Sequence, residues 1–152
     1  MKVEQSIVIE RPIDVVFAHR SVLDKTAEWQ RDVIATELLT VGPVACGTRA
    51  TETRRGQGDA EADWDLEITE FELNRVLGIV SRCGDLELHE RVVFTAVEGN
   101  TCYTARIELI GSKLPNTVFQ KKTVEALLTL KEQIEGRTAA LLTRRRIPVR
   151  ER

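Results

Sequence analysis

The chain has few of the residues that build the commonest catalytic and metal sites. It contains three cysteines and two histidines, and Cys46, Cys83 and Cys102 are far apart, with no C-x-x-C spacing. This set favours neither a disulfide framework nor a zinc site, and we expect no metal and no cofactor. The sequence also has no phosphate-binding loop, no G-x-S-x-G element and no Ser-His-Asp order, so it lacks the common nucleotide-binding and serine-hydrolase signatures.

Long apolar runs are absent as well. No segment approaches the roughly 20 residues that a membrane-spanning helix needs. The stretch from Met1 to Gln5 has no basic segment followed by an apolar one, as a signal peptide would. With 42% hydrophobic and 30% charged residues in a length of 152, the composition is typical of one ordinary globular domain. We therefore expect a cytoplasmic protein with a substantial core.

The net charge of −2 conceals an uneven distribution. Residues 137–152 hold six Arg and one Glu, a charge of +5, so residues 1–136 carry −7. The sequence thus predicts a domain over 1–136 and a basic C-terminal tail over 137–152. Because the tail has no aromatic residue to stack on a base and the body is acidic, we expect no nucleic-acid binding. A helix extension is the alternative to an arm that docks on the acidic face, within one chain or in a homodimer.

The longest helical pattern runs from Ser112 to Glu135. Its apolar residues recur mostly at three- and four-residue steps, which predicts an amphipathic helix. These residues are Leu114, Val118, Val124, Leu127, Leu128 and Ile134. Pro115 suits a first turn and Gly136 suits the position just after a helix. Such a helix must bury its apolar stripe against another layer, and the alternating sequence before it is the available partner.

Seven segments have strand-like patterns. Val3, Gln5, Ile7 and Ile9 alternate with polar residues, which predicts an N-terminal strand that Pro12 ends. Two short helices are then predicted, one to about His19 and one from Lys25 to about Arg31 with Asp24 as a suitable cap. The remaining strands are expected at Val33–Val41, Thr48–Arg55, Ala60–Phe71, Arg75–Arg82, Leu86–Val97 and Thr101–Ile110. Short turns between them, such as the one predicted over residues 56–59, favour antiparallel neighbours.

This order of elements, together with several short motifs, resembles the helix-grip fold of the START-like superfamily, which includes polyketide cyclases and lipid-transfer proteins. The motifs are I-E-R-P-I-D-V-V-F over Ile9–Phe17, then Trp29, G-T-R over Gly47–Arg49 and G-N-T-C-Y over Gly99–Tyr103. The resemblance covers about residues 3–135. It implies an α+β fold, with a seven-stranded antiparallel sheet wrapped around the C-terminal helix. It also implies a hydrophobic cavity between sheet and helix, and it leaves the chemistry open.

Strand alternation indicates which side chains face that cavity. The inward set is aromatic and aliphatic with few polar groups, as a small-molecule pocket requires. The candidate ligand-binding residues are Phe17, Trp29, Trp64, Leu66, Leu88, Glu90, Val92, Tyr103, Ile107 and Phe119. Plain core packing is the alternative for Phe17, Trp64, Tyr103 and Phe119, whereas Trp29, on a short helix beside a loop, is expected at the mouth of the pocket. The outward carboxylates at 61, 63, 65 and 67 are interpreted as a solvated face.

Glu90 is the exception on an otherwise apolar strand face. A carboxylate there pairs with a cation, for which Arg49, Arg75 and Arg106 are the expected candidates, lies at an edge, or acts on a ligand. We consider it a candidate catalytic acid or base, with Tyr103 as a candidate hydrogen-bond donor.

The inward residues and the resemblance together imply three candidate functions. The first is a carrier or sensor that binds a small hydrophobic or amphipathic molecule, such as a lipid, in the cavity. The second is a polyketide cyclase or dehydrase-like enzyme that uses the same cavity. The third is a protein-interaction module, which an exposed apolar patch without a cavity would favour.

Overall fold

A computed structural model describes residues 1–56 and 60–150, with side chains for residues 1–56 and 60–136. The helical elements are α1 (Ile13–Ser21), the 3-10 helix η1 (Leu23–Glu28) and α2 (Asn116–Arg150). The strands are β1 (Lys2–Ile9), β2 (Val33–Leu38), β3 (Arg49–Arg55), β4 (Glu61–Glu72), β5 (Val76–Cys83), β6 (Leu86–Val97) and β7 (Asn100–Ile110). The prediction of two short helices after the first strand, followed by six strands and a long helix, is confirmed.

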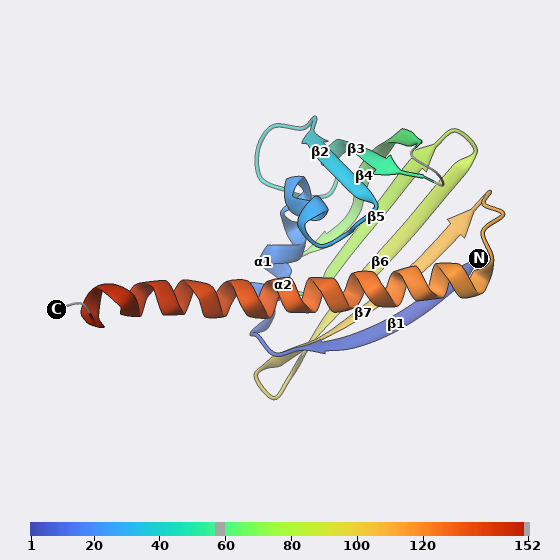
Figure 1. The fold of residues 1–152 in the computed structure, drawn as a ribbon. Coiled ribbons are helices and arrows are strands. Elements are labelled where there is room, and N and C mark those ends of the chain that lie inside the picture. Colours follow the sequence, from blue (N-terminus) through green and yellow to red (C-terminus); the bar gives the residue numbers. More distant parts are fainter. Residues whose placement is uncertain (57–59, 151–152) are drawn as a thin grey trace.

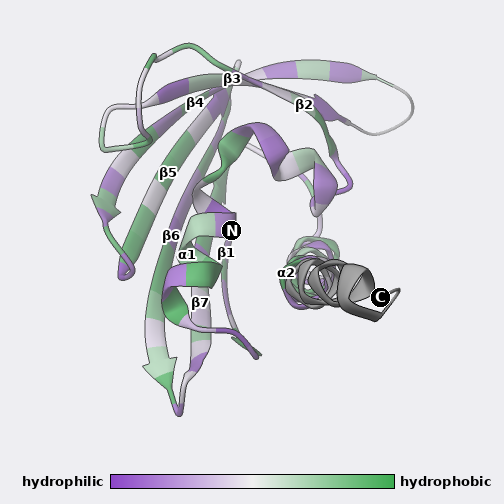
Figure 2. Ribbon diagram, turned by 90° about the vertical axis from the view of Figure 1, so that its left-hand side faces the viewer, coloured by the Kyte–Doolittle hydropathy of each residue, from purple (hydrophilic) through white to green (hydrophobic). Residues whose placement is uncertain are grey.

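The strands form one antiparallel sheet in the order β1-β7-β6-β5-β4-β3-β2, so that the first and second strands in sequence lie at opposite edges. Figure 1 shows the sheet with α2 running across it. Figure 2, turned by 90°, shows α2 nearly end-on in the hollow of the curved sheet, with α1 beside it. The two short helices therefore close one end of the space between sheet and α2.

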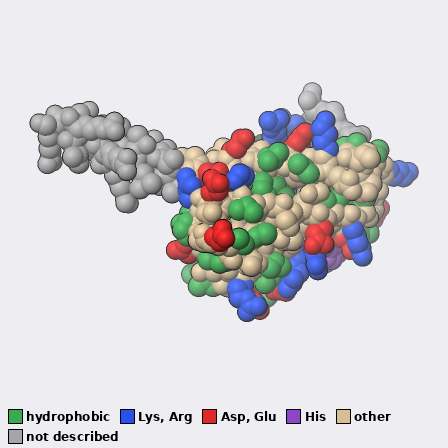
Figure 3. Space-filling model, turned by 90° about the horizontal axis from the view of Figure 1, so that it is seen from below, with side chains coloured by type: hydrophobic (Ala, Val, Ile, Leu, Met, Phe, Trp, Pro, Cys, Tyr) green, Lys and Arg blue, Asp and Glu red, His purple; other side chains and the backbone are tan. Residues whose placement is uncertain are grey.

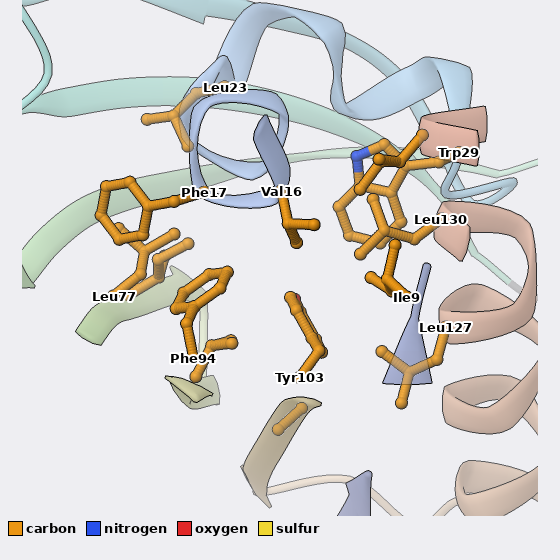
Figure 4. Packing of buried hydrophobic residues seen from close by; sticks show 14 of the residues in the cluster. Ile9, Val16, Phe17, Leu23, Trp29, Leu77, Phe94, Tyr103, Leu127 and Leu130 are labelled. Atoms are coloured by element: carbon orange, nitrogen blue, oxygen red, sulfur yellow. The ribbon is translucent and has the colours of Figure 1, made fainter. Parts of the chain in front are cut away.

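The core lies where α1, α2 and the sheet meet. Ile68 and Val92 come from central strands and Leu130 and Ile134 from α2, and all four side chains are almost fully buried. Figure 4 shows how side chains from α1, β1, β6, β7 and α2 point toward one another here. Phe94 contacts both Phe17 and Tyr103 edge to face, with ring centroids 4.9 Å and 5.3 Å apart. The period-2 strands and the helical stripe thus supply complementary faces.

Helix α2 extends further than its sequence pattern predicted. It begins at Asn116, directly after Pro115, and it passes through Gly136 and ends at Arg150. The prediction that Gly136 ends the helix was wrong. An interior glycine costs about 1 kcal/mol relative to alanine, and the residues that follow are rich in the strong helix formers Ala, Leu and Arg. The predicted contact of the tail with the acidic body lies outside the side chains that the structure describes.

Two further local predictions have different outcomes. Asp24 does not cap η1, because this helix begins at Leu23 and its capping position is Val22. The turn predicted over residues 56–59 falls largely on residues 57–59, which lie outside the described part of the chain. The strands on either side of it, β3 and β4, pair antiparallel from Arg55 opposite Glu61.

The link from the sheet to α2 contains one close backbone approach. Gly111 has a φ of 86°, and a Cβ built on it would lie 2.3 Å from the carbonyl oxygen of Asp85 in the turn between β5 and β6. Only glycine fits this position. The turn therefore fixes where the chain leaves β7 for α2.

Charged side chains of both signs lie near one another at several places on the face of the molecule shown in Figure 3, with hydrophobic side chains among them. Arg91 on β6 bonds to Glu70 on β4 at 3.0 Å, across Gly78 of the intervening β5, which has no side chain to separate them. His89 bonds to Glu87 at 2.8 Å. These outward charges pair with one another, as expected for a solvated face.

Candidate ligand-binding site

A cavity of about 710 Å³ lies between the sheet and the N-terminal half of α2. Its walls include Trp64 of β4, Leu88 of β6 and Phe119 of α2, and the segment after η1 contributes Trp29. The volume is within the roughly 300–1,000 Å³ that small-molecule sites occupy. Most of this wall is apolar because inward positions of the strands meet the apolar stripe of the helix here.

The predicted ligand-binding residues separate into two groups. Trp29, Trp64, Leu88 and Phe119 line the cavity. The other six lie deeper in the protein: Phe17, Leu66, Val92 and Tyr103 belong to the buried core, Ile107 packs against it, and Glu90 bonds to a core arginine. Alternation identified the inward face, and the course of α2 decides which inward side chains border empty space.

Glu90 is paired with a cation that the sequence did not suggest. The Nη2 atom of Arg20, on α1, donates a hydrogen bond to Glu90 Oε1 at 2.5 Å. Its Nε atom donates to the hydroxyl of Tyr103 at 2.9 Å. The expected partners were wrong: Arg75 bonds to Glu72, Arg106 bonds to Glu4, and Arg49 is exposed at the start of β3.

This Arg20 cluster is mostly sealed from water. The side chain of Arg20 is 4% exposed and that of Glu90 is 18% exposed. Burial alone would lower the pKa of Arg20, but the Tyr103 hydroxyl and the Glu90 carboxylate more than offset this, so the pKa is raised and the guanidinium stays charged. Burial also raises the pKa of Tyr103 to about 12, although Arg20 opposes the shift. Near neutral pH, Arg20 is therefore a cation and Tyr103 a neutral phenol.

A second Arg–Glu pair lies at the cavity wall. Glu52, on β3, is 2% exposed and accepts a hydrogen bond from Arg54 Nε at 2.6 Å. Thr36 donates a second bond to Glu52 at 3.1 Å. The guanidinium of Arg54 lies over the ring of Trp64, 4.6 Å from its centroid, and both side chains line the cavity. A charged, stacked guanidinium is thus presented beside an apolar wall.

The sequence analysis missed both arginines and Glu52, although the signals were present. Arg20 follows Val16 and Phe17 by four and three residues, so it continues the buried stripe of α1. Glu52 and Arg54 alternate with Thr51 and Thr53 along β3, which places them on the inward face. A charged residue at an inward position is costly to bury without a partner, so Arg20, Glu52 and Arg54 carry the same signal as Glu90.

Charged residues also border the cavity opening. Lys122 of α2 bonds to Asp32 of the segment after η1 at 3.2 Å, and both side chains are about half exposed. Arg55 and Lys113 lie on the same rim. Among the described residues there is no cluster of His, Cys, Asp or Glu that could hold a metal ion. No helix in that part of the chain is both long and apolar enough to span a membrane.

Comparison with solved structures defines the class of fold. This chain has a helix-grip fold, a seven-stranded antiparallel sheet around a C-terminal helix with short helices after the first strand, and it shares this fold with a solved START superfamily protein. A scan against protein-family models finds no match, and neither does a search of curated proteins.

Particular structures illustrate this likeness. The Zhui aromatase/cyclase from Streptomyces sp. R1128 matches with a TM-score of 0.76 and 12% identity, over 91% of this chain and 95% of that one. A START superfamily protein from Mycobacterium smegmatis matches with a TM-score of 0.71 and 13% identity, over 92% and 98%. The di-domain aromatase/cyclase StfQ of the steffimycin pathway matches with a TM-score of 0.73 and 12% identity, over 90% of this chain and 46% of that one. At these identities the comparisons establish the fold alone.

Proposed function

We propose that this protein binds a small hydrophobic or amphipathic molecule in the cavity beneath α2, as a carrier or sensor. The observation that carries the proposal is the 710 Å³ space with Trp64, Leu88 and Phe119 on its wall. A cavity of this volume with apolar walls favours a small molecule whose own apolar surface is mostly buried when it binds. Among the charged residues that line the cavity, Arg54 is the one stacked on the wall residue Trp64, so a ligand with an anionic or strongly polar end can gain a charge-assisted hydrogen bond there.

Cysteine labelling tests this proposal without any mutation. Cys83 lines the cavity, whereas Cys46 is exposed and bonds to the carbonyl oxygen of Thr69 outside it. A bound molecule should slow alkylation of Cys83 and leave Cys46 unchanged. Protein purified from its own host is compared before and after delipidation, with peptide mass spectrometry of both cysteines and native mass spectrometry for a bound molecule. Equal labelling of Cys83 in all states, with no added mass, would count against the proposal.

A matched pair of variants locates the binding. Ala126 on α2 lines the cavity and Gln120 on the same helix is exposed outside it. Ala126→Phe fills part of the cavity and should weaken binding of a fluorescent fatty-acid probe at least tenfold, while Gln120→Phe should leave affinity within about twofold. Circular dichroism confirms that both variants are folded. Equal affinities in the two variants would place the probe elsewhere.

The alternative is a cyclase-like enzyme that uses the same cavity. Its support is the similarity to two aromatase/cyclase structures together with the presence of Arg54, which could stabilise negative charge on a reacting oxygen. Glu90 remains the predicted acid or base of this alternative and Tyr103 its predicted hydrogen-bond donor, although both contact Arg20. Turnover of a poly-β-ketone mimic, followed by loss of turnover in Glu90→Gln, would favour the enzyme. Unchanged ligand affinity without any turnover would favour the carrier.

A further inference from the structure

Trp29 lies between two hollows of the protein. The first is the main cavity, and the second is a smaller groove of about 240 Å³ between the short helices and the middle of α2, at residues 130–134. Its apolar lining comes from Ala18, Val22, Leu130 and Ile134 beside Trp29, and the polar side chains His19, Lys25, Glu28 and Gln133 border it as well. Trp29 lines both spaces, so its indole is a shared wall.

The ring is held in place from the core. Arg20 lies against Trp29, with its guanidinium carbon 5.0 Å from the ring centroid. Arg20 is fixed in turn by its hydrogen bonds to Glu90 and Tyr103. Figure 4 shows the indole of Trp29 beside Leu130 of α2 and near Ile9 of β1. A side chain that is 8% exposed and stacked on a fixed cation has one defined orientation.

We propose that Trp29 is a specificity-determining partition that limits the length of the ligand's apolar chain, and that the Arg20 cluster positions it. The inference rests on the proposed function. It also assigns a non-catalytic role to Glu90, whose carboxylate acts on the ligand only through Arg20 and Trp29. The ligand class is an amphipathic molecule with an unbranched chain, whose polar end lies toward Arg54 and the rim.

The physical reason is the apolar character of the space behind the ring. A chain that reaches Trp29 in the wild type meets the indole and must bend or stop. If the indole is removed, the chain can pass into the groove and bury further methylenes against Val22 and Leu130. Each additional buried methylene contributes about 0.8 kcal/mol, or about fourfold in affinity.

The experiment measures affinity against chain length. Saturated fatty acids of 8 to 18 carbons displace a fluorescent probe from the wild type and from Trp29→Ala. In the wild type, affinity should rise about fourfold per methylene up to a limiting length and then stay level. In Trp29→Ala the limiting length should move to longer acids by at least two carbons. Trp29→Phe, which keeps an aromatic ring in the core, should move it less.

Refilling the groove provides the matched control. Ala18 lines the groove and is exposed on α1. Ala18→Leu in the Trp29→Ala background should return the limiting length toward that of the wild type. Arg20→Leu should lengthen the limit in the same direction as Trp29→Ala, and urea unfolding measures its loss of stability separately. If Arg20 has only a structural role, Arg20→Leu should lower the stability of the protein and leave the limiting chain length unchanged.

The outcomes separate the two proposals. If folded Trp29→Ala and Trp29→Phe keep the wild-type limit while the wild type binds the acids, the partition is wrong and the binding function stands. If the limit moves but Ala18→Leu does not restore it, the groove is not where the chain goes, and the partition is overturned in this form. If none of the acids displaces the probe from the wild type, both proposals fail.

Discussion

Two Arg–Glu pairs in this protein have the same components and opposite arrangements. In each, the arginine lies over a tryptophan ring and bonds to a glutamate at hydrogen-bond distance. In the first pair Arg20 is the more deeply buried partner, whereas in the second it is Glu52. The first pair adds the Tyr103 hydroxyl inside the core. The second presents Arg54 on the cavity wall.

This difference indicates which pair meets a ligand. A buried charge needs its partner because desolvation is costly, so the more buried member fixes the geometry. For the first pair that member is Arg20, which supports the wall through Trp29. For the second it is Glu52, which holds Arg54 at the cavity with its charge compensated. Both pairs are therefore expected to contribute to stability, and the second, which presents Arg54 at the cavity, is expected to contribute to recognition as well.

The largest expected effect is on stability, from Glu90→Gln. This change leaves the nearly buried guanidinium of Arg20 without its counter-charge, and removal of one partner of a buried pair costs roughly 3 kcal/mol. Urea unfolding should show a loss of about this size. The control is Glu70→Gln, which breaks the exposed bond to Arg91 and should cost less than about 1 kcal/mol. Equal losses in the two variants would contradict the assignment of the first pair to stability.

An alkaline pH dependence is the next largest effect. The pKa of Tyr103 is raised to about 12 by burial, from about 10 in the unfolded chain. The unfolded state therefore loses its proton first, and the stabilisation, complete below pH 10, is lost as pH rises toward 12. The loss should reach roughly 2–3 kcal/mol over this interval.

The measurement compares urea unfolding of the wild type and Tyr103→Phe at pH 9 and pH 11.5. Lysines titrate in the same range in both proteins, so the difference between the two pH dependences isolates Tyr103. The phenyl ring of the variant cannot ionise, and the variant should lose less stability between the two pH values than the wild type. Parallel pH profiles would show that Tyr103 is not sealed from water.

Recognition should depend on the second pair. Arg54→Gln removes a charged donor at the cavity wall, and a hydrogen bond to a charged group is worth about 1.5–3 kcal/mol. Affinity for a fatty acid should fall at least tenfold, while affinity for the alcohol of the same length should fall less. Arg54→Lys keeps the charge but loses the planar stack on Trp64, and it should give an intermediate result. Equal losses of affinity for the acid and the alcohol would indicate that the variant changes the shape of the cavity wall and that Arg54 does not recognise the charge of the acid.

The smallest effect should come from the exposed bond between Lys122 and Asp32 at the cavity opening. Asp32→Asn should change stability by less than about 1 kcal/mol. Because the bond joins α2 to the segment after η1 beside the opening, its loss should speed both association and dissociation of a fluorescent fatty acid in stopped-flow measurements. Added salt should speed the wild type in the same way and affect Asp32→Asn less. Unchanged rates would show that the ligand enters by another route.

Much of the fold followed from local patterns. The strand predicted over Leu86–Val97 has the same bounds as β6, because alternation and turn residues act within a few positions of one another. Inward positions were also predictable, since side-chain direction repeats every two residues. The end of α2 was not, because Gly136 is a common stop signal that the helix formers after it override.

The candidate site was less predictable because it depends on distant contacts. Arg20 meets Glu90 and Tyr103 across separations of 70 and 83 residues, which no local pattern reports. The same limit applies to the cavity, where Trp64 borders open space while Leu66, two residues further along the same face of β4, lies in the core. Only the path of α2 distinguishes such positions.

That path begins at Gly111. The close backbone contact there helps to set the position of α2, so the size of the cavity depends on this contact as well as on the side chains of the walls. A methyl group at this residue would collide with the carbonyl of Asp85, so the turn or the start of the link to α2 would have to give way. Helix and sheet would then separate or tilt, and the space between them would change while Trp64, Leu88 and Phe119 kept their identities. The volume open to the proposed ligand can thus be changed by a substitution at Gly111 alone, while every large side chain of the cavity wall stays the same.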